Sequence, residues 1–225
     1  MAVTPFAPVA RSNHGGRRAA VFLDKDGTLI EDVPYNVDPN LIRLTDGALD
    51  GLRSLHDAGY LLIVVSNQSG IARGYFEEQA LGAVEQRMRR LLDAARVPLA
   101  GFYYCPHHPD GGVDAYSVEC ACRKPAPGLL SRAARNHGVS LGRSWMIGDI
   151  LHDVEAGRRA GCRTILLDVG HETEWELTPV RIPDFTMANL DAAARLIINV
   201  DGESTLRVGQ HPAHDGRPTA GVSRG

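Results

Sequence analysis

The sequence predicts a single α/β domain, with a parallel sheet covered by helices on both faces. Apolar runs typical of strands alternate with helical patterns along most of the chain. These runs show little alternation with polar residues, which is typical of strands buried on both sides. With 225 residues, 44% of them hydrophobic and 23% charged, the chain is long enough for one well-buried domain.

The predicted elements follow one another in a regular order. Strands are expected at Ala19–Asp24, Tyr60–Ser66, Gly101–Tyr104, Ser144–Gly148 and Arg163–Asp168. Helical patterns lie between them, at 47–58, 77–96, 127–137 and 151–160, and a last helix at 189–198 closes the domain. Residues 1–17 and 203–225 mix Pro, Gly, Ser, Arg and His without periodicity, so we expect flexible extensions around a domain at 18–202.

The overall charge limits the classes of partner. A net charge of −3 and a pI near 6.3 argue against a nucleic-acid-binding surface, which is usually strongly basic. No stretch approaches the roughly 18 apolar residues of a membrane span, and the N-terminus lacks the apolar core of a signal peptide. We therefore expect a cytoplasmic monomer that binds a small molecule, with no nucleic-acid or membrane partner.

Two carboxylates follow the first predicted strand, one residue apart. The buried run ends in Asp24, Asp26 and Gly27, and ligands collect at the carboxyl ends of strands in open α/β sheets. Two acids so close raise each other's pKa unless a cation such as Mg²⁺, which prefers oxygen ligands, holds them. A turn with solvated acids is the alternative interpretation of the motif.

Polar residues also follow the second and fourth predicted strands, and Lys124 precedes a helix. In a parallel sheet these groups converge, and together they suit phosphoryl transfer. In this interpretation Asp24 is the nucleophile, forming an aspartyl-phosphate, and Asp26 is the general acid/base. Ser66 and Lys124 would stabilise the phosphoryl group, and the Asn67 backbone amide would donate a hydrogen bond to it. Asp149 would bind the metal together with Asp24 and Asp26, and Asp153 would support the metal's waters.

Cysteines are concentrated in one loop. Cys105, His107, Cys120 and Cys122 together can form the tetrahedral ligand set of a structural Zn²⁺. The neighbouring His108 is an alternative fourth ligand. A surface loop whose thiols bind no metal is the alternative to a zinc site. Because the loop leads into Arg123 and Lys124, a bound metal would position both side chains.

The order of these motifs resembles the haloacid-dehalogenase-like superfamily. The matching motifs are the DxDGT run from Asp24, then Ser66, Lys124 and the GDxxxD run with Asp149 and Asp153. The resemblance implies a Rossmann-like fold, Mg²⁺, an aspartyl nucleophile at Asp24 and, in most such members, phosphatase activity. Neither gap that carries a cap domain in the superfamily has room for a large one, so a capless, open site is expected.

Within the superfamily, the run Ser66–Gly74 and the cysteine loop resemble the D-glycero-D-manno-heptose 1,7-bisphosphate 7-phosphatases. Histidinol-phosphate phosphatases share most of these motifs and are the alternative; a polynucleotide phosphatase or a nucleic-acid-binding zinc module is a more distant one. One position departs from the family, because Ile150 stands where many heptose bisphosphatases carry Lys. The resemblance implies these substrate-contacting residues: Asp32, Tyr35, Ser66, Asn67, Gln68, Ser69, Arg73, Arg123 and Lys124.

Overall fold

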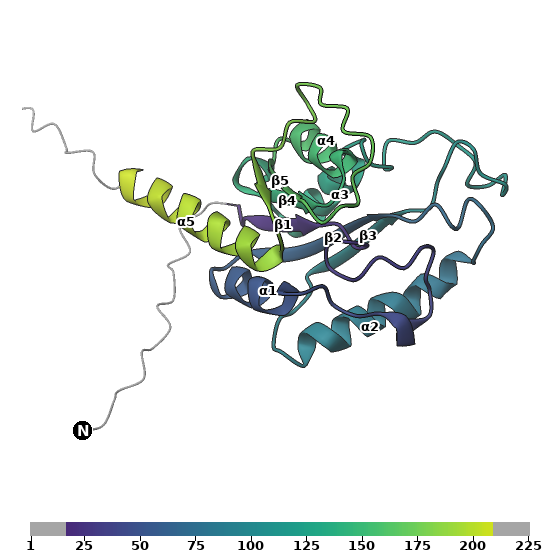
Figure 1. Ribbon diagram of the computed structural model, residues 1–225, viewed down its shortest axis with the longest axis horizontal. Coiled ribbons are helices and arrows are strands. Elements are labelled where there is room, and N and C mark those ends of the chain that lie inside the picture. Colours follow the sequence, from purple (N-terminus) through teal and green to yellow (C-terminus); the bar gives the residue numbers. More distant parts are fainter. Residues whose placement is uncertain (1–16, 209–225) are drawn as a thin grey trace, which may run out of the picture.

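The computed structural model describes residues 17–208, with side chains for residues 17–203. Its strands are β1 (Ala20–Leu23), β2 (Leu61–Asn67), β3 (Gly101–Cys105), β4 (Trp145–Gly148), β5 (Arg163–Leu167) and β6 (Phe185–Met187). They form one parallel sheet in the order β3-β2-β1-β4-β5-β6 (Figure 1). The winding direction reverses between β1 and β4, and ligands bind at the carboxyl ends of strands where such a reversal occurs.

Helices cover both faces of the sheet. They are α1 (Ala48–Asp57), α2 (Leu81–Asp93), α3 (Gly128–His137), α4 (Leu151–Ala160) and α5 (Leu190–Val208). Helices α1 and α2 lie on one side of the sheet and α3 and α4 on the other (Figure 1). In one hydrophobic cluster, side chains of α1, α2 and α5 pack with Val21 and Leu23 of β1; in the other, α3 and α4 pack with Ala20 and Phe22. Every residue of β1 is buried, which confirms the prediction of a strand covered on both sides.

Each predicted strand is present, and its ends differ from the prediction by no more than one residue. The helix predicted at 77–96 is shorter than expected, since a 3₁₀ turn at Glu78–Ala80 precedes α2. Strand β6 was missed altogether. Its three residues, all at least partly exposed, give too short a pattern to be recognised at the edge of a sheet.

The last helix is longer than predicted. Helix α5 continues to Val208, so the expected C-terminal tail, starting at residue 203, begins inside a helix. The carboxylate of Asp201 explains part of this extension. It accepts hydrogen bonds from the Tyr60 hydroxyl and from Trp145 Nε1, and it pairs with Arg163. The rest of the two predicted extensions, residues 1–16 and 209–225, lies outside the described residues.

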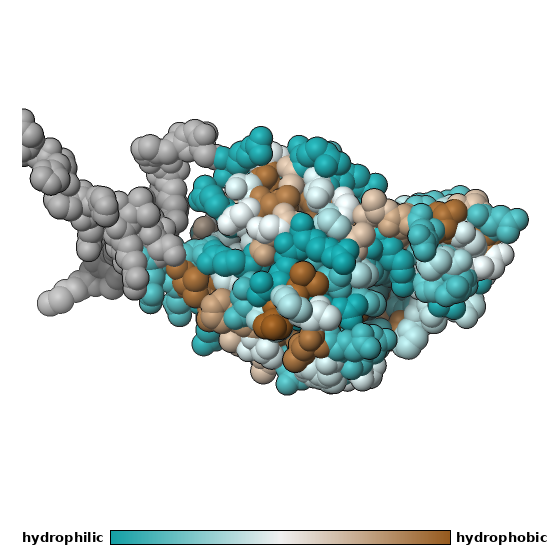
Figure 2. All heavy atoms as spheres, turned by 90° about the horizontal axis from the view of Figure 1, so that it is seen from above, coloured by the Kyte–Doolittle hydropathy of each residue, from teal (hydrophilic) through white to brown (hydrophobic). Residues whose placement is uncertain are grey.

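The two segments that could carry a cap domain hold only short elements. Between β1 and β2 lie a 3₁₀ turn at Pro39–Leu41 and helix α1, and between β2 and β3 the only α-helix is α2. None of the helices among residues 17–208 has the length and apolar character needed to cross a membrane. On the face shown in Figure 2, hydrophobic residues lie in small groups among hydrophilic ones. A cytoplasmic location remains a prediction.

Candidate active site

Three carboxylates meet at the carboxyl ends of β1 and β4. Asp24 follows β1, and its backbone N–H donates to Ile147 O of β4 at 2.9 Å. Asp149 follows β4, and Asp153 lies in the first turn of α4. Carboxylate oxygens of Asp24, Asp149 and Asp153 lie within 4.8 Å of one another, and all three residues are buried. The sequence placed these residues together correctly.

A buried ammonium group binds two of these carboxylates. Lys124 Nζ lies 2.6 Å from an oxygen of Asp24 and 2.6 Å from an oxygen of Asp153, and it donates to Val65 O at 3.0 Å. Asn67 fixes the backbone of this lysine, since its side-chain amide donates to Lys124 O and accepts from Lys124 N. The Asn67 side chain therefore fixes the position of the Lys124 backbone.

The cluster carries more negative than positive charge. Burial, reinforced by the neighbouring Asp24, raises the pKa of Asp149 to about 6. Burial also raises the pKa of Asp153 to about 8, although the Lys124 ammonium opposes this. For Lys124, burial lowers the pKa, but Asp153 and Asp24 outweigh it and raise the pKa overall. Three carboxyl groups thus face one ammonium, and a divalent cation with hard oxygen ligands would favour their ionised forms.

Asp26 points to a different side of the site. One of its oxygens lies 2.7 Å from Lys25 Nζ, and the other accepts from Gln68 Nε2 at 3.3 Å. Burial is the main cause that raises the pKa of Asp26, with Lys25 opposing it. A carboxyl group with a raised pKa can hold a proton and give it up during a reaction. Gln68 also donates to the Ser66 hydroxyl at 2.8 Å, which links Ser66 to this group.

A cavity of about 250 Å³ opens beside Asp26. Of the predicted substrate residues, Asp32, Tyr35, Asn67, Gln68 and Ser69 line it. Ser66 and Lys124 are buried and not part of its lining. The lining thus combines the segment after β1 with the end of β2 and the residues that follow it.

The two predicted arginines lie together at another edge of the site. Arg73 Nη2 is 3.2 Å from Nε2 of His108, and Arg123 donates to His107 O at 3.4 Å. Burial lowers the pKa of Arg123, and the nearby Arg73 contributes in the same direction. Neither arginine lines the cavity, although Tyr35, which does, interacts electrostatically with Arg123.

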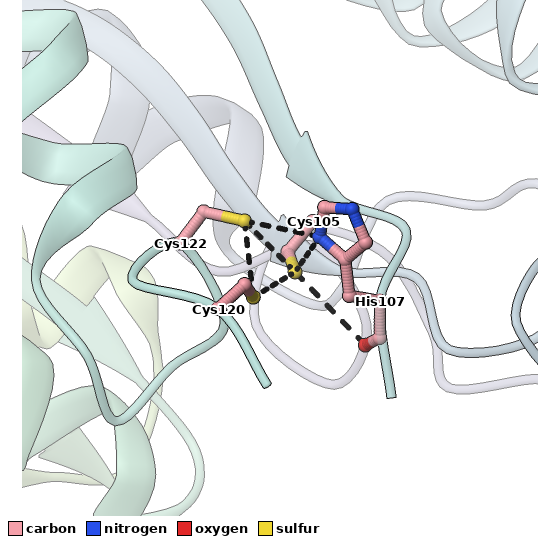
Figure 3. A group of neighbouring side chains, drawn as sticks. All are labelled: Cys105, His107, Cys120 and Cys122. Atoms are coloured by element: carbon pink, nitrogen blue, oxygen red, sulfur yellow. Dashed lines mark hydrogen bonds between the residues drawn. The ribbon is translucent and has the colours of Figure 1, made fainter. Parts of the chain in front are cut away.

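The cysteine loop folds into a compact cluster (Figure 3). The sulfur atoms of Cys105, Cys120 and Cys122 lie 3.2–3.5 Å apart, and His107 Nδ1 lies 3.4 Å from Cys122 and 3.6 Å from Cys105. Sulfur atoms bound about 2.3 Å from one tetrahedral metal would be about 3.8 Å apart, close to these separations. His108 is not part of the group. Burial raises the pKa of the Cys105 thiol, a cost that a bound metal cation offsets.

Two residues at the site were not recognised in the sequence. Lys25, within the DxD motif, is buried, contacts Asp26 and lines the cavity. His171, in the loop after β5, places Nδ1 2.7 Å from an oxygen of Asp149, whose other oxygen accepts from the Thr28 hydroxyl at 3.0 Å. A Cβ at Gly27 would lie 2.2 Å from Asp149 and 2.3 Å from His171, so this contact needs a glycine. Lys25 occupies the position of the motif that is open to any residue. His171 belongs to no motif whose residue spacing could have pointed to it.

A parallel sheet with this constellation at its switch point defines a haloacid-dehalogenase-like hydrolase. The HAD-hydrolase-like family model matches residues 121–193. A solved structure from Mesorhizobium loti, 33% identical, has a TM-score of 0.72 and covers 83% of this chain and 88% of that one. The D,D-heptose 1,7-bisphosphate phosphatase from B. bronchiseptica, crystallised with magnesium and phosphate, is 29% identical with a TM-score of 0.66, over 81% of this chain and 99% of that one.

The relatives among known sequences narrow the family further. The D-glycero-beta-D-manno-heptose-1,7-bisphosphate 7-phosphatase of Yersinia pestis is 40% identical over 148 residues, which cover 66% of this chain and 79% of that enzyme. The chain belongs to the D-glycero-beta-D-manno-heptose-1,7-bisphosphate 7-phosphatase family. The predicted family, fold and phosphatase class are thereby confirmed.

Proposed function

We propose that this protein hydrolyses the 7-phosphate of D-glycero-D-manno-heptose 1,7-bisphosphate through an aspartyl-phosphate on Asp24. The observation that carries the proposal is the buried Lys124 ammonium, 2.6 Å from Asp24 and from Asp153 and beside Asp149. Such a group can neutralise a phosphoryl group as it reaches Asp24. The family relationship supports the choice of sugar.

The carboxylate cluster fits Mg²⁺. We assign the ion to the carboxylates of Asp24 and Asp149 and to the backbone carbonyl of Asp26, with Asp153 in support. The excess of buried negative charge over the one ammonium supports this assignment. When bound, Mg²⁺ would draw charge from the non-bridging phosphate oxygens and orient the phosphoryl group for attack.

The chain's own residues account for both chemical steps. Lys124 donates to Oδ1 of Asp24, so Oδ2 is the oxygen that attacks phosphorus as the bond to the sugar oxygen breaks. Asp26, whose pKa is raised, gives its proton to that leaving oxygen. In the second step Asp26 accepts a proton from the water that cleaves the aspartyl-phosphate. The Ser66 hydroxyl, the Asn67 backbone amide and Lys124 stabilise the phosphoryl group in both steps.

The substrate would extend from this point into the cavity beside Asp26. Its sugar hydroxyls would form hydrogen bonds with Asp32, Gln68 and Ser69, and the ring of Tyr35 would line one side of the cavity. A bisphosphate also needs a cationic site for the phosphate that is not hydrolysed, and the planar guanidinium groups of Arg73 and Arg123 suit phosphate oxygens.

The second metal would be structural. Cys105, His107, Cys120 and Cys122 would hold Zn²⁺ with all four positions filled, which leaves no place for a reacting water. Because Arg123 and Lys124 follow Cys122 directly, the ion would hold both side chains toward the site. Its effect on catalysis would be indirect.

The test is phosphate release from a panel of substrates in the presence of Mg²⁺. The panel holds both anomers of the heptose bisphosphate, histidinol phosphate and fructose 1,6-bisphosphate. We expect the highest kcat/KM for a heptose bisphosphate anomer, and a higher value for histidinol phosphate would refute the proposed substrate. The Asp24→Asn variant should lose turnover but keep its fold, whereas the control Asp50→Asn, on the exposed surface of α1, should match the wild type. An active Asp24→Asn enzyme would refute the mechanism.

A further inference from the structure

Two separate segments form opposite sides of the cavity beside Asp26. One side belongs to residues 32–38, which we call the flap tip, and the other to residues 67–70 at the end of β2 and after it. The flap tip contributes four lining residues, which are Asp32, Pro34, Tyr35 and Asn36. A ligand in the cavity can contact both sides only while the flap tip is held at a fixed distance from residues 67–70.

The flap tip forms no hydrogen bond that would hold it in this place. Among residues 17–203, all of its hydrogen bonds stay between residues 33 and 41, such as the bond from Asn36 N to Val33 O at 3.1 Å and that from Asp38 N to Asn36 Oδ1 at 2.8 Å. The side chain of Val37 packs against the hydrophobic cluster of α1, α2 and α5. These contacts shape the tip and anchor one side chain, but they do not tie it to residues 67–70.

An aromatic contact supplies the missing connection. The rings of Tyr35 and Tyr75 meet edge to face, with their centroids 4.6 Å apart and their planes at 82°. Such pairs stabilise a contact beyond the area that they bury. The backbone of Tyr35 has a φ of +56°, in the left-handed region that residues other than glycine rarely adopt. A conformation of this kind persists where surrounding contacts hold it, and it is frequent at ligand sites.

Tyr75 is fixed to the opposite side of the cavity. Its backbone N–H donates to Gly70 O at 2.9 Å, and the N–H of Arg73 donates to Ser69 O at 3.0 Å. A Cβ at Gly70 would lie 2.3 Å from the ring of Phe76, so this ring packs directly on the glycine. Because Ser69 and Gly70 both line the cavity, the ring of Tyr75 extends from the same short segment as that side of the lining.

We propose that Tyr75 is a positioning residue that docks the flap tip, through Tyr35, at the distance from residues 67–70 that a phosphorylated sugar requires. The inference rests on the proposed function and adds a specificity-determining residue to it. Tyr75 does not line the cavity, so it acts through Tyr35, which does. A substrate whose sugar fills the cavity depends on this contact, whereas inorganic phosphate has no sugar to contact the flap tip.

The kinetic test uses two variants of Tyr75. Tyr75→Ala removes the ring, and Tyr75→Phe keeps it. For the heptose 1,7-bisphosphate, Tyr75→Ala should raise KM about 3- to 10-fold and leave kcat within about 2-fold, because the lost contact favours the bound ground state and the transition state alike. Tyr75→Phe should stay within about 2-fold of the wild type. The inhibition constant of inorganic phosphate should be the same in all three proteins.

Several results would overturn the proposal. An unchanged KM would exclude the docking role, and a lower kcat at unchanged KM would place the effect of Tyr75 at the reacting centre. Equal losses in Tyr75→Ala and Tyr75→Phe would assign the effect to the hydroxyl group, and weaker inhibition by phosphate would show a general disturbance of the site. The control Leu177→Ala, at a side chain 59% exposed in the loop between β5 and β6, should match the wild type. Tyr75 itself is 60% exposed, so its replacement leaves no cavity in the core.

A second measurement does not depend on any substrate. The amide protons of Asn36 and Asp38 take part in the internal hydrogen bonds of the flap tip, and NMR measures their exchange with water in the free protein. Exchange should be about 3- to 10-fold faster in Tyr75→Ala and close to the wild type in Tyr75→Phe. Unchanged exchange in Tyr75→Ala would overturn the docking contact. A wild type that does not hydrolyse the heptose bisphosphate would instead overturn the proposed function, and the exchange rates would still decide whether Tyr75 docks the flap tip.

Discussion

Removing the negative charge of Asp149 should stabilise the protein when Mg²⁺ is absent. The pKa of this carboxyl group rises from 3.8 to about 6 on folding, chiefly because the group is buried and secondarily because Asp24 lies near. The folded state therefore binds more protons than the unfolded state between about pH 4 and pH 6, and stability falls as the pH rises through this window. At pH 8 the loss is complete and amounts to about 3 kcal/mol.

Asp149→Asn is the matched perturbation, because the amide keeps the shape of the side chain and an oxygen for the Thr28 hydroxyl. In Mg²⁺-free buffer at pH 8 the variant should be more stable than the wild type by about 3 kcal/mol. For a domain of this size that is a rise in Tm of about 6–12 °C. At pH 5 the difference should shrink to about half, because the wild-type carboxyl group is then largely protonated in the folded state.

Thermal unfolding followed by circular dichroism measures both effects. Samples are dialysed without a strong chelator, so that a metal in the cysteine loop is kept. Adding Mg²⁺ at pH 8 should raise the Tm of the wild type and leave that of Asp149→Asn nearly unchanged, since ligand binding stabilises only the state that binds. A variant less stable than the wild type at pH 8 without Mg²⁺ would refute the argument from excess buried charge.

Four further changes test other parts of the structure. Lys124→Met should abolish turnover and lower the free energy of unfolding by about 3–5 kcal/mol in urea titrations, because two buried carboxylates lose their partner; an unchanged stability would contradict this. Cys120→Ser should reduce the zinc content measured by mass spectrometry and lower the Tm, and full zinc occupancy would argue against the ligand set. His171→Ala should weaken Mg²⁺ binding about 10- to 100-fold in calorimetry, with His171→Asn closer to the wild type, because the ring orients Asp149; equal affinities would exclude that role. Asp201→Ala should cost about 1–3 kcal/mol with kcat unchanged, as it removes the acceptor that holds α5; a loss of kcat would show that α5 affects the site.

The central part of the fold could be predicted because local pattern and tertiary burial agree there. The residues of β1 and β4 are apolar throughout and fully buried, so their sequence pattern has one interpretation. At the edge of the sheet, local sequence pattern and tertiary burial no longer agree. Strand β6 has three residues, and the second half of α5 is held by Asp201, whose contacts with Tyr60 and Arg163 span long sequence distances. No local pattern encodes such contacts.

The candidate site likewise contains residues that the sequence could predict and residues that it could not. Asp24 and Asp149 directly follow buried strands, so motif and topology together predicted that they would meet, and Lys124 joins them after the cysteine loop. Lys25 and His171 were missed for different reasons. Lys25 was passed over as the variable residue of a motif, and His171 reaches Asp149 from a loop 22 residues further along the chain, across the close approach that Gly27 permits.

The substrate-binding part of the site depends on contacts between loops. Asn67 binds the backbone of Lys124, and the backbone N–H groups of Gly112 and Val113 bind that of Ala72. The end of β2 with the residues after it and the segment that holds the cysteine loop and Lys124 are therefore joined at two places, one beside the proposed nucleophile and one beside the arginines. A change that loosens the second junction, such as a substitution in the cysteine loop, should raise KM for a bisphosphate more than it lowers kcat. The first junction holds Lys124 against Asp24, so its loss should lower kcat. Substrate choice and chemistry can thus change separately, although the same two loops carry both.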